Sequence, residues 1–155
     1  MLSKQIAKHL RELYFGGNWT CSNFREQLAD ITWQEAVSKV PSLNTIAVLT
    51  HHVSYYVAAV LKVFEGEALK AKDELSFDHL PIESQQDWET LRDGALRDAE
   101  RLAILIEQLP DEKWWDVFEQ EKYGNYYRNI SGIIEHTHYH LGQIALIKKM
   151  LRNES

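Results

Sequence analysis

Two histidines near the C-terminus have the spacing of a metal-ligand pair. His136 and His140 are four residues apart in a stretch whose apolar residues recur every three or four positions, which predicts an α-helix from about Ile130 to Leu151. Side chains one helical turn apart lie about 5–6 Å from each other, so one ion can bind both imidazoles. The pair shares the apolar stripe, where a polar ring costs free energy unless it is hydrogen-bonded or coordinated. Because such spacing is more often met by two hydrogen-bonded or partly exposed histidines, a metal site requires a third ligand.

A second helical stretch supplies a third imidazole. The residues from Ser42 to about Glu65 carry a core-facing stripe that includes His52. His51 lies about 100° around the helix, on a line that leads to Lys62. We therefore expect His52 to join the pair, with His51 as the alternative ligand. Three imidazoles around one divalent ion leave a coordination position for water or substrate, as in catalytic zinc sites, and imidazole also suits nickel, copper and iron.

Four long helical segments are expected to position these histidines. Ser42, Ser84 and Asn129 are the expected N-caps of the last three segments, and Gly16 with Gly17 ends the first. No stretch has the alternating period of a strand, and no composition break marks a second domain. The pattern predicts an all-α four-helix bundle with long connections, forming one domain over residues 1–155, with its site between facing helices. The expected segments run from about Leu2 to Leu13, Ser42 to Glu65, Ser84 to Leu109 and Asn129 to Leu151.

The connections between these segments are expected to be long and mostly irregular. Asn18 to Asp30 has no clear helical period, and Glu67 to Glu83 forms a polar link. Thr32, followed three residues later by Glu35, matches a capping box that starts a short helix.

Composition excludes several classes of protein. The chain has 17 Lys and Arg against 23 Asp and Glu, a net charge of −6, which opposes binding to nucleic acid and to anionic membranes. No apolar run approaches the roughly 20 residues of a membrane span. The single cysteine, Cys21, excludes an intrachain disulfide framework and fits a reducing compartment. We expect a cytoplasmic protein that binds a small-molecule substrate, with no nucleic-acid or membrane partner.

Two polar residues about one turn beyond the histidines are candidate substrate contacts. These are Tyr56 and Gln143, for which core packing and helix-surface exposure are the simpler alternatives. His138 lies roughly 200° around the helix from His136 and is expected on another face. Thr137 follows His136 where an HExxH metalloprotease has glutamate, so a peptidase of that class is not expected. No residue can be assigned a catalytic role from the sequence.

The histidine-bearing stretches resemble those of the DinB/YfiT-like superfamily of bacterial four-helix bundles. Its members typically have a histidine in the second helix and an HxxxH pair followed by a GQ segment in the last. The matching stretches are TIAVLTHH at 45–52 and HTHYHLGQI at 136–144, and the resemblance extends over essentially the whole chain in helix order. It implies that His52, His136 and His140 bind a divalent metal, often zinc or nickel, and that the protein is frequently a homodimer.

The resemblance also implies a function. Characterised relatives include thiol-dependent transferases and isomerases, and others are described as metal-dependent hydrolases. We expect a metal-dependent thiol transferase or hydrolase that acts on small electrophilic molecules, with a low-molecular-weight thiol as cosubstrate in the first case. The alternatives are a non-catalytic metal- or ligand-binding protein of the stress response and a metal-free bundle that serves dimerisation.

Overall fold

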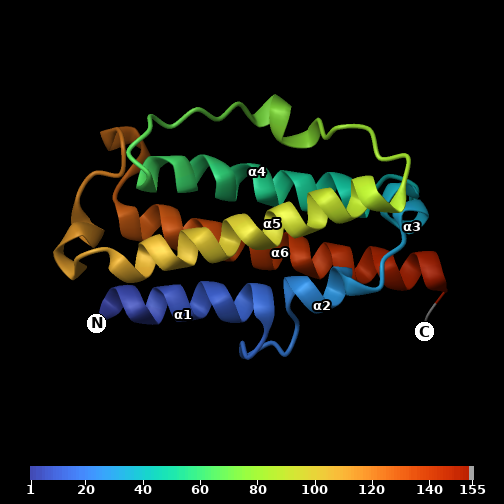
Figure 1. Cartoon of the computed structure of the whole chain (residues 1–155), viewed down its shortest axis with the longest axis horizontal. Helices are drawn as coiled ribbons and strands as arrows, with labels where there is room; N and C mark the ends of the chain where they lie inside the picture. The colour runs from blue at the N-terminus through green and yellow to red at the C-terminus, as the bar shows by residue number, and fades with distance from the viewer. Residues whose placement is uncertain (154–155) are drawn as a thin grey trace.

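Four long α-helices lie side by side and form most of the fold (Figure 1). The computed structural model describes residues 1–153. Within these residues there is no β-strand, only an isolated antiparallel bridge between Val117 and Asn125. The prediction of an all-α four-helix bundle is therefore confirmed. The long helices are α1 (Leu2–Phe15), α4 (Ile46–Phe64), α5 (Gln85–Gln108) and α6 (Tyr126–Arg152), and the short ones in the first connection are α2 (Phe24–Ala29) and α3 (Trp33–Val37).

The core forms where the apolar stripes of the long helices meet. Each stripe recurs at three- and four-residue steps, so a helix buries one face and leaves the other in solvent. On α4 the buried stripe also contains His52, which is 5% exposed, and this places an imidazole among apolar side chains. The fully buried core residues include Leu10, Leu13, Ile46, Trp88, Leu102, Ile106, Ile130 and Ile144.

The helix directions require a long crossover between α4 and α5. In Figure 1, α1 and α6 run one way, while α4 and α5 run the other way. Two parallel neighbours cannot be joined by a tight turn, so residues 65–84 return along the whole length of α4 (Figure 1). This segment, called the crossover below, contains the 3-10 helix η1 (Asp73–Phe77), which packs against α4. The crossover thereby brings polar and aromatic side chains next to His52.

Two of the expected N-caps are wrong. The cap of α4 is Thr45, whose hydroxyl accepts from the backbone N–H of Val48; Ser42 lies in a preceding turn with φ of 66°. The cap of α6 is Asn125, so the helix begins at Tyr126 and Asn129 lies inside it. In both cases a second residue of a capping type lies three or four positions away, and the tertiary path of the chain decides which one starts the helix.

Other local predictions are confirmed, and one helix was missed. Ser84 caps α5 by accepting from the backbone N–H of Asp87, and Thr32 with Glu35 forms the complete capping box of α3. The stretch expected to be irregular contains α2, whose cap is Asn23. A six-residue helix shows too little periodicity to be predicted from its apolar pattern.

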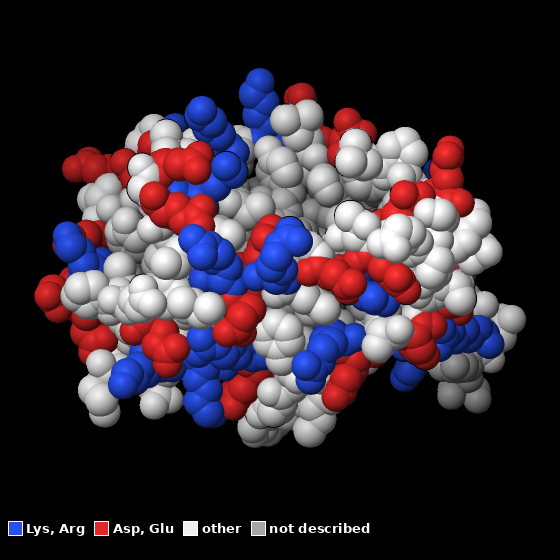
Figure 2. Space-filling model, in the orientation of Figure 1, with Lys and Arg blue, Asp and Glu red and all other residues white. Residues whose placement is uncertain are grey.

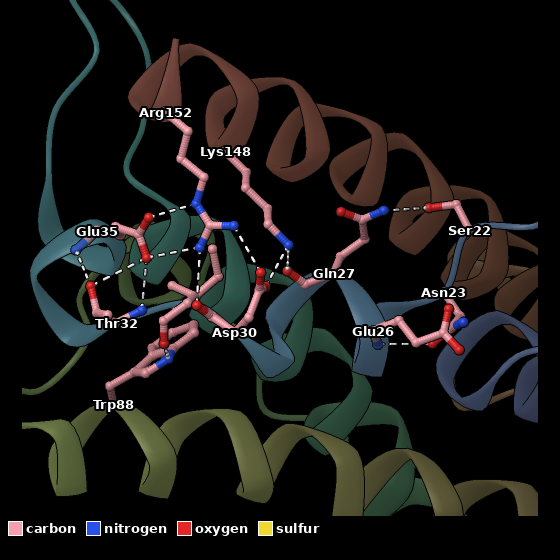
Figure 3. Close-up of polar contacts among 11 residues, drawn as sticks. Ser22, Asn23, Glu26, Gln27, Asp30, Thr32, Glu35, Trp88, Lys148 and Arg152 are labelled. Carbon is pink, nitrogen blue, oxygen red and sulfur yellow. Dashed lines mark hydrogen bonds and ion pairs between the residues drawn. The ribbon is translucent and has the colours of Figure 1, made fainter. Parts of the chain in front are cut away.

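The C-terminal end of α6 is tied to the first connection by ion pairs (Figure 3). Arg152 pairs with Asp30 at 2.8 Å and with Glu35 at 2.7 Å, and Lys148 pairs with Asp30 at 2.6 Å. The indole N–H of Trp88 donates to the carbonyl of Ile31 at 2.9 Å, which adds a contact from α5 (Figure 3). These contacts fix α2 and α3 across one end of the bundle.

One helix is more apolar than the sequence pattern suggested. By length and composition, α4 could cross a membrane: an 18-residue window of this 19-residue helix has a mean hydropathy of 1.3, although 61% of that window is buried inside the fold. Such burial is typical of a core helix.

On the face shown in Figure 2, acidic and basic side chains are interspersed, and no extended area of the surface carries charges of a single sign.

Candidate metal centre

The side chains of His52, His136 and His140 converge between α4 and α6. The Nε2 atom of His136 lies 3.0 Å from Nε2 of His52 and 3.1 Å from Nε2 of His140. The ligand atoms of all three residues lie within 4.8 Å of one another. Two nitrogens bound to one tetrahedral zinc ion at about 2.0–2.1 Å are about 3.3 Å apart. The spacing of these rings therefore suits three ligands of a single ion.

A hydrogen-bond chain from the crossover determines which nitrogen of His52 faces the cluster. The hydroxyl of Ser76 donates to the carbonyl oxygen of Asp73 at 2.6 Å, which leaves its oxygen as the acceptor for His52 Nδ1 at 2.8 Å. The proton of His52 is therefore on Nδ1, and the lone pair on Nε2 points into the cluster.

An amide on α6 has the same effect on His140. The Nδ1 atom of His140 donates to Oε1 of Gln143 at 2.7 Å, so its Nε2 lone pair also points toward His136. Outer hydrogen bonds of this kind orient metal-ligating histidines and fix their tautomers. Lone pairs that face one another at about 3 Å repel unless a cation or a proton lies between them, so the donor set fits a divalent ion.

Aromatic packing restricts the ring of His52 further. Phe77 of the crossover stacks on this ring with the centroids 4.2 Å apart and an interplanar angle of 18°. Tyr56 packs edge-on against His52 and against His136, with centroid distances of 5.2 and 5.3 Å. These contacts limit rotation of the rings, so the cluster is already arranged to receive an ion.

Burial keeps two of the rings uncharged at neutral pH. Desolvation lowers the pKa of His136 to about 4, with a further contribution from the neighbouring His140 and His52. The pKa of His52 is also lowered, chiefly by desolvation. Metal ions bind the neutral imidazole, so these two ligands need not lose a proton at pH 7.

A pocket of about 660 Å³ opens beside the cluster. His52 and His136 line it, whereas His140 does not. Asp73 and Glu135 also line the pocket, and a pocket of this volume can hold a small molecule. A group bound at the cluster is thus accessible from the pocket.

The structure places the other candidate residues in different surroundings. Tyr56 lines the pocket, and its hydroxyl donates to the carboxylate of Asp73. Gln143 contacts His140 instead of the large pocket. His51 lies outside the cluster, with Nε2 3.1 Å from the carbonyl oxygen of Leu75, and His138 lies near His9 of α1 with their ring centroids 6.3 Å apart.

Sequence reasoning missed the contribution of the crossover. Asp73, Ser76 and Phe77 all contact the histidines or line the pocket, yet they lie in the link that the sequence predicts only to be polar. No periodicity or spacing in this segment indicates such a role, because 24 residues separate Ser76 from the histidine that it holds.

A comparison with protein families adds an independent finding. The model of the DinB superfamily matches residues 18–144, a range that contains all three clustered histidines. The chain belongs to the DinB superfamily. No curated protein and no solved structure matches it significantly. Membership of the DinB superfamily and the buried cluster together fit a helical metal-binding protein.

Proposed function

We propose that this DinB-superfamily protein is a divalent-metal-dependent enzyme that acts on small electrophilic molecules, as a thiol-dependent transferase or as a hydrolase. The observation that supports this function is the convergence of three imidazole Nε2 atoms at the wall of a pocket of about 660 Å³. A purely structural site closes its coordination sphere with four protein ligands, whereas three ligands leave a position for a reacting group. Zinc and nickel are the ions that we propose.

The bound cation would supply Lewis acidity and lower the pKa of a water or thiol that it binds. The protein's own residues would orient the site. Ser76 and Gln143 hold the outer nitrogens of two ligands, and Phe77 covers the ring of His52. This side chain also separates part of the ligand set from bulk water.

Two side chains that line the pocket have proposed roles toward the nucleophile and the substrate. Glu135 is an exposed carboxylate next to His136, and it lines the pocket, so we propose it as the base that accepts a proton from the attacking nucleophile. Desolvation and the hydrogen bond to Asp73 raise the pKa of Tyr56. Tyr56 therefore stays protonated and is available to orient a polar substrate group.

Metal analysis tests the site, and a turnover assay tests the reaction. We expect about one equivalent of zinc or nickel in the purified protein and loss of the metal in His136→Ala. His138→Ala and His51→Ala are matched controls, since they remove histidines from the same two helices outside the cluster. Metal content should stay unchanged in both.

The turnover assay separates the two enzyme classes from a binding role. Electrophiles are supplied with and without a low-molecular-weight thiol, and ester hydrolysis is followed in parallel. Thiol-dependent product that is lost in His136→Ala would assign a transferase, and thiol-independent hydrolysis would assign a hydrolase. A fully metal-loaded protein that turns over neither class would contradict the enzyme proposal, and a protein that takes up no divalent ion would contradict the metal site.

Two wider properties belong to the same proposal. The charge balance and the single cysteine support a cytoplasmic location, and the family resemblance supports a homodimer. Sedimentation analysis of the metal-loaded protein tests whether it is a dimer.

A further inference from the structure

One arginine of the pocket has no partner of its own. Among residues 1–153, every other arginine side chain forms an ion pair with a carboxylate or donates to a main-chain carbonyl. The guanidinium of Arg128 makes no such contact, although the chain has 23 Asp and Glu residues against 17 Lys and Arg. Arg128 lines the pocket that opens at the histidines. An unpaired guanidinium in a pocket is a ready partner for an anionic group.

The loop before α6 directs this side chain. Gly124 has φ of 78°, and a Cβ atom at this position would lie 2.7 Å from Cδ of Arg128. The aliphatic stem of Arg128 therefore packs directly on the glycine main chain. Any larger residue at position 124 would be strained and would displace the stem, so the loop conformation and the arginine position depend on each other.

The pocket has opposite charges at its two ends. Asp73 and Glu135 are at the histidine end, where they disfavour a second anion. Arg128 is at the other end, and Lys122 lies nearby with Nζ 4.8 Å from the ring centroid of Tyr123, which also lines the pocket. A ligand with one anionic terminus is therefore favoured in one orientation only.

The middle of the pocket is long and apolar. Its lining follows α4 from His52 to Val60 and α6 from His136 back to Arg128, and eight residues at 1.5 Å each span about 12 Å. Ala59, Val60 and Ile133 form the apolar walls. A Cβ atom added at Gly132 would meet nothing within 4 Å, so this part of the groove is open.

We infer that the substrate is an elongated organic anion whose carboxylate, or similar anionic group, binds Arg128 while its reactive group lies at the histidine cluster about two helical turns away. The inference rests on the proposed function and narrows its substrate class. Arg128 is then the specificity-determining residue of the pocket, and Gly124 positions it.

Hydroxamates provide a binding test that does not depend on turnover. The hydroxamate group binds a protein-held divalent ion, so octanohydroxamate and suberic acid monohydroxamate differ only in whether the far end carries a methyl or a carboxylate. We expect the zinc-loaded protein to bind the carboxylate-bearing probe about 10-fold more tightly, because a hydrogen bond to a charged group contributes on the order of 1.4 kcal/mol. Calorimetric titration measures both affinities.

Matched variants assign the gain to Arg128. Arg128→Gln should make the two probes equal, whereas Arg97→Gln, which removes an arginine outside the pocket, should leave the 10-fold difference intact. Gly132→Leu fills the open part of the groove and should weaken both long probes, while acetohydroxamate binds as before. Circular dichroism confirms that each variant is folded.

The outcomes separate this inference from the proposed function. Equal affinity of the two long probes for the wild type, with both bound, would overturn the anion subsite and leave the metal site intact. A 10-fold difference that persists in Arg128→Gln would overturn the assignment of this residue. If no hydroxamate binds and metal analysis finds no ion, both the proposed function and the inference are wrong.

Discussion

At the scale of single residues, the hydroxyl of Ser76 controls the chemistry of His52. It is fully buried, and it accepts from Nδ1 only because its own proton is donated to the carbonyl of Asp73. Replacing Ser76 with alanine would leave a buried N–H without an acceptor and allow the other tautomer, whose Nε2 carries the proton and cannot bind a metal. We predict that Ser76→Ala lowers zinc affinity about 10- to 100-fold.

Competition with a chromogenic chelator measures this loss of affinity. Ser54→Ala serves as the control, because Ser54 is a half-buried serine of α4 that makes no contact with the cluster. Equal zinc affinity in Ser76→Ala and wild type would show that the aromatic packing of Phe77 orients His52 without the hydrogen bond.

The histidine ligands can be predicted from the sequence more fully than the residues that surround them. His136 and His140 are one turn apart on one helix, so their proximity follows from the helical repeat alone. The more apolar stripe of His52 favours it over His51 as the third ligand, and in the structure His52 lies with the pair. Ser76 follows from no repeat, because 24 residues separate it from His52 and the path of the crossover brings the two together. Arg128 lies on α6 two turns before His136, but the packing of its stem on Gly124 depends on the loop before the helix.

At the scale of helices, the ion pairs at the end of α6 make stability depend on acid pH. The Arg152 guanidinium holds the pKa of Asp30 and the pKa of Glu35 at about 2. Their unfolded values are about 4, so the contribution of these carboxylates is fully present above pH 4 and is lost as the pH falls toward 2. We predict that Arg152→Met lowers the free energy of unfolding by about 1 kcal/mol at pH 7 and by progressively less from pH 4 to pH 2.

Urea unfolding of wild type and variant at several pH values checks this dependence. Arg97→Met is the control, because the Arg97 side chain is 75% exposed and pairs only with its neighbour Asp98, so it should change stability little at any pH. A difference between wild type and Arg152→Met that stays constant from pH 7 to pH 2 would contradict the assigned role.

Helices themselves follow from the sequence better than their ends do. The apolar stripes of α1, α4, α5 and α6 extend over several turns, so their existence and their buried faces could be predicted. Thr45 and Ser42 are both good N-caps, and only the turn formed before α4 decides between them. That turn depends on packing between distant parts of the chain, which local propensity does not describe.

At the scale of the whole molecule, a bound ion would join two helices that are far apart in sequence. His52 and His136 are separated by 84 residues, so only the folded bundle presents the complete ligand set. We predict that zinc at 100 times its dissociation constant stabilises the native protein by about 2.7 kcal/mol and raises the melting temperature by roughly 5 to 10 °C.

Thermal unfolding with zinc and with a chelator measures this shift. The shift should disappear in His136→Ala and persist in His138→Ala, whose missing ring lies outside the cluster. An equal shift in both variants would indicate that zinc binds elsewhere on the surface.

The crossover also separates what keeps the bundle folded from what shapes the pocket. From Glu67 to Lys72 no side chain is fully buried and only Leu69 packs against the core, yet Leu69 and Ala71 form part of the pocket wall. Substitutions at exposed positions usually change stability by less than about 0.5 kcal/mol. This stretch is therefore free to vary among descendants of the protein, and new substrate preferences can arise there while the four helices and their histidines stay as they are.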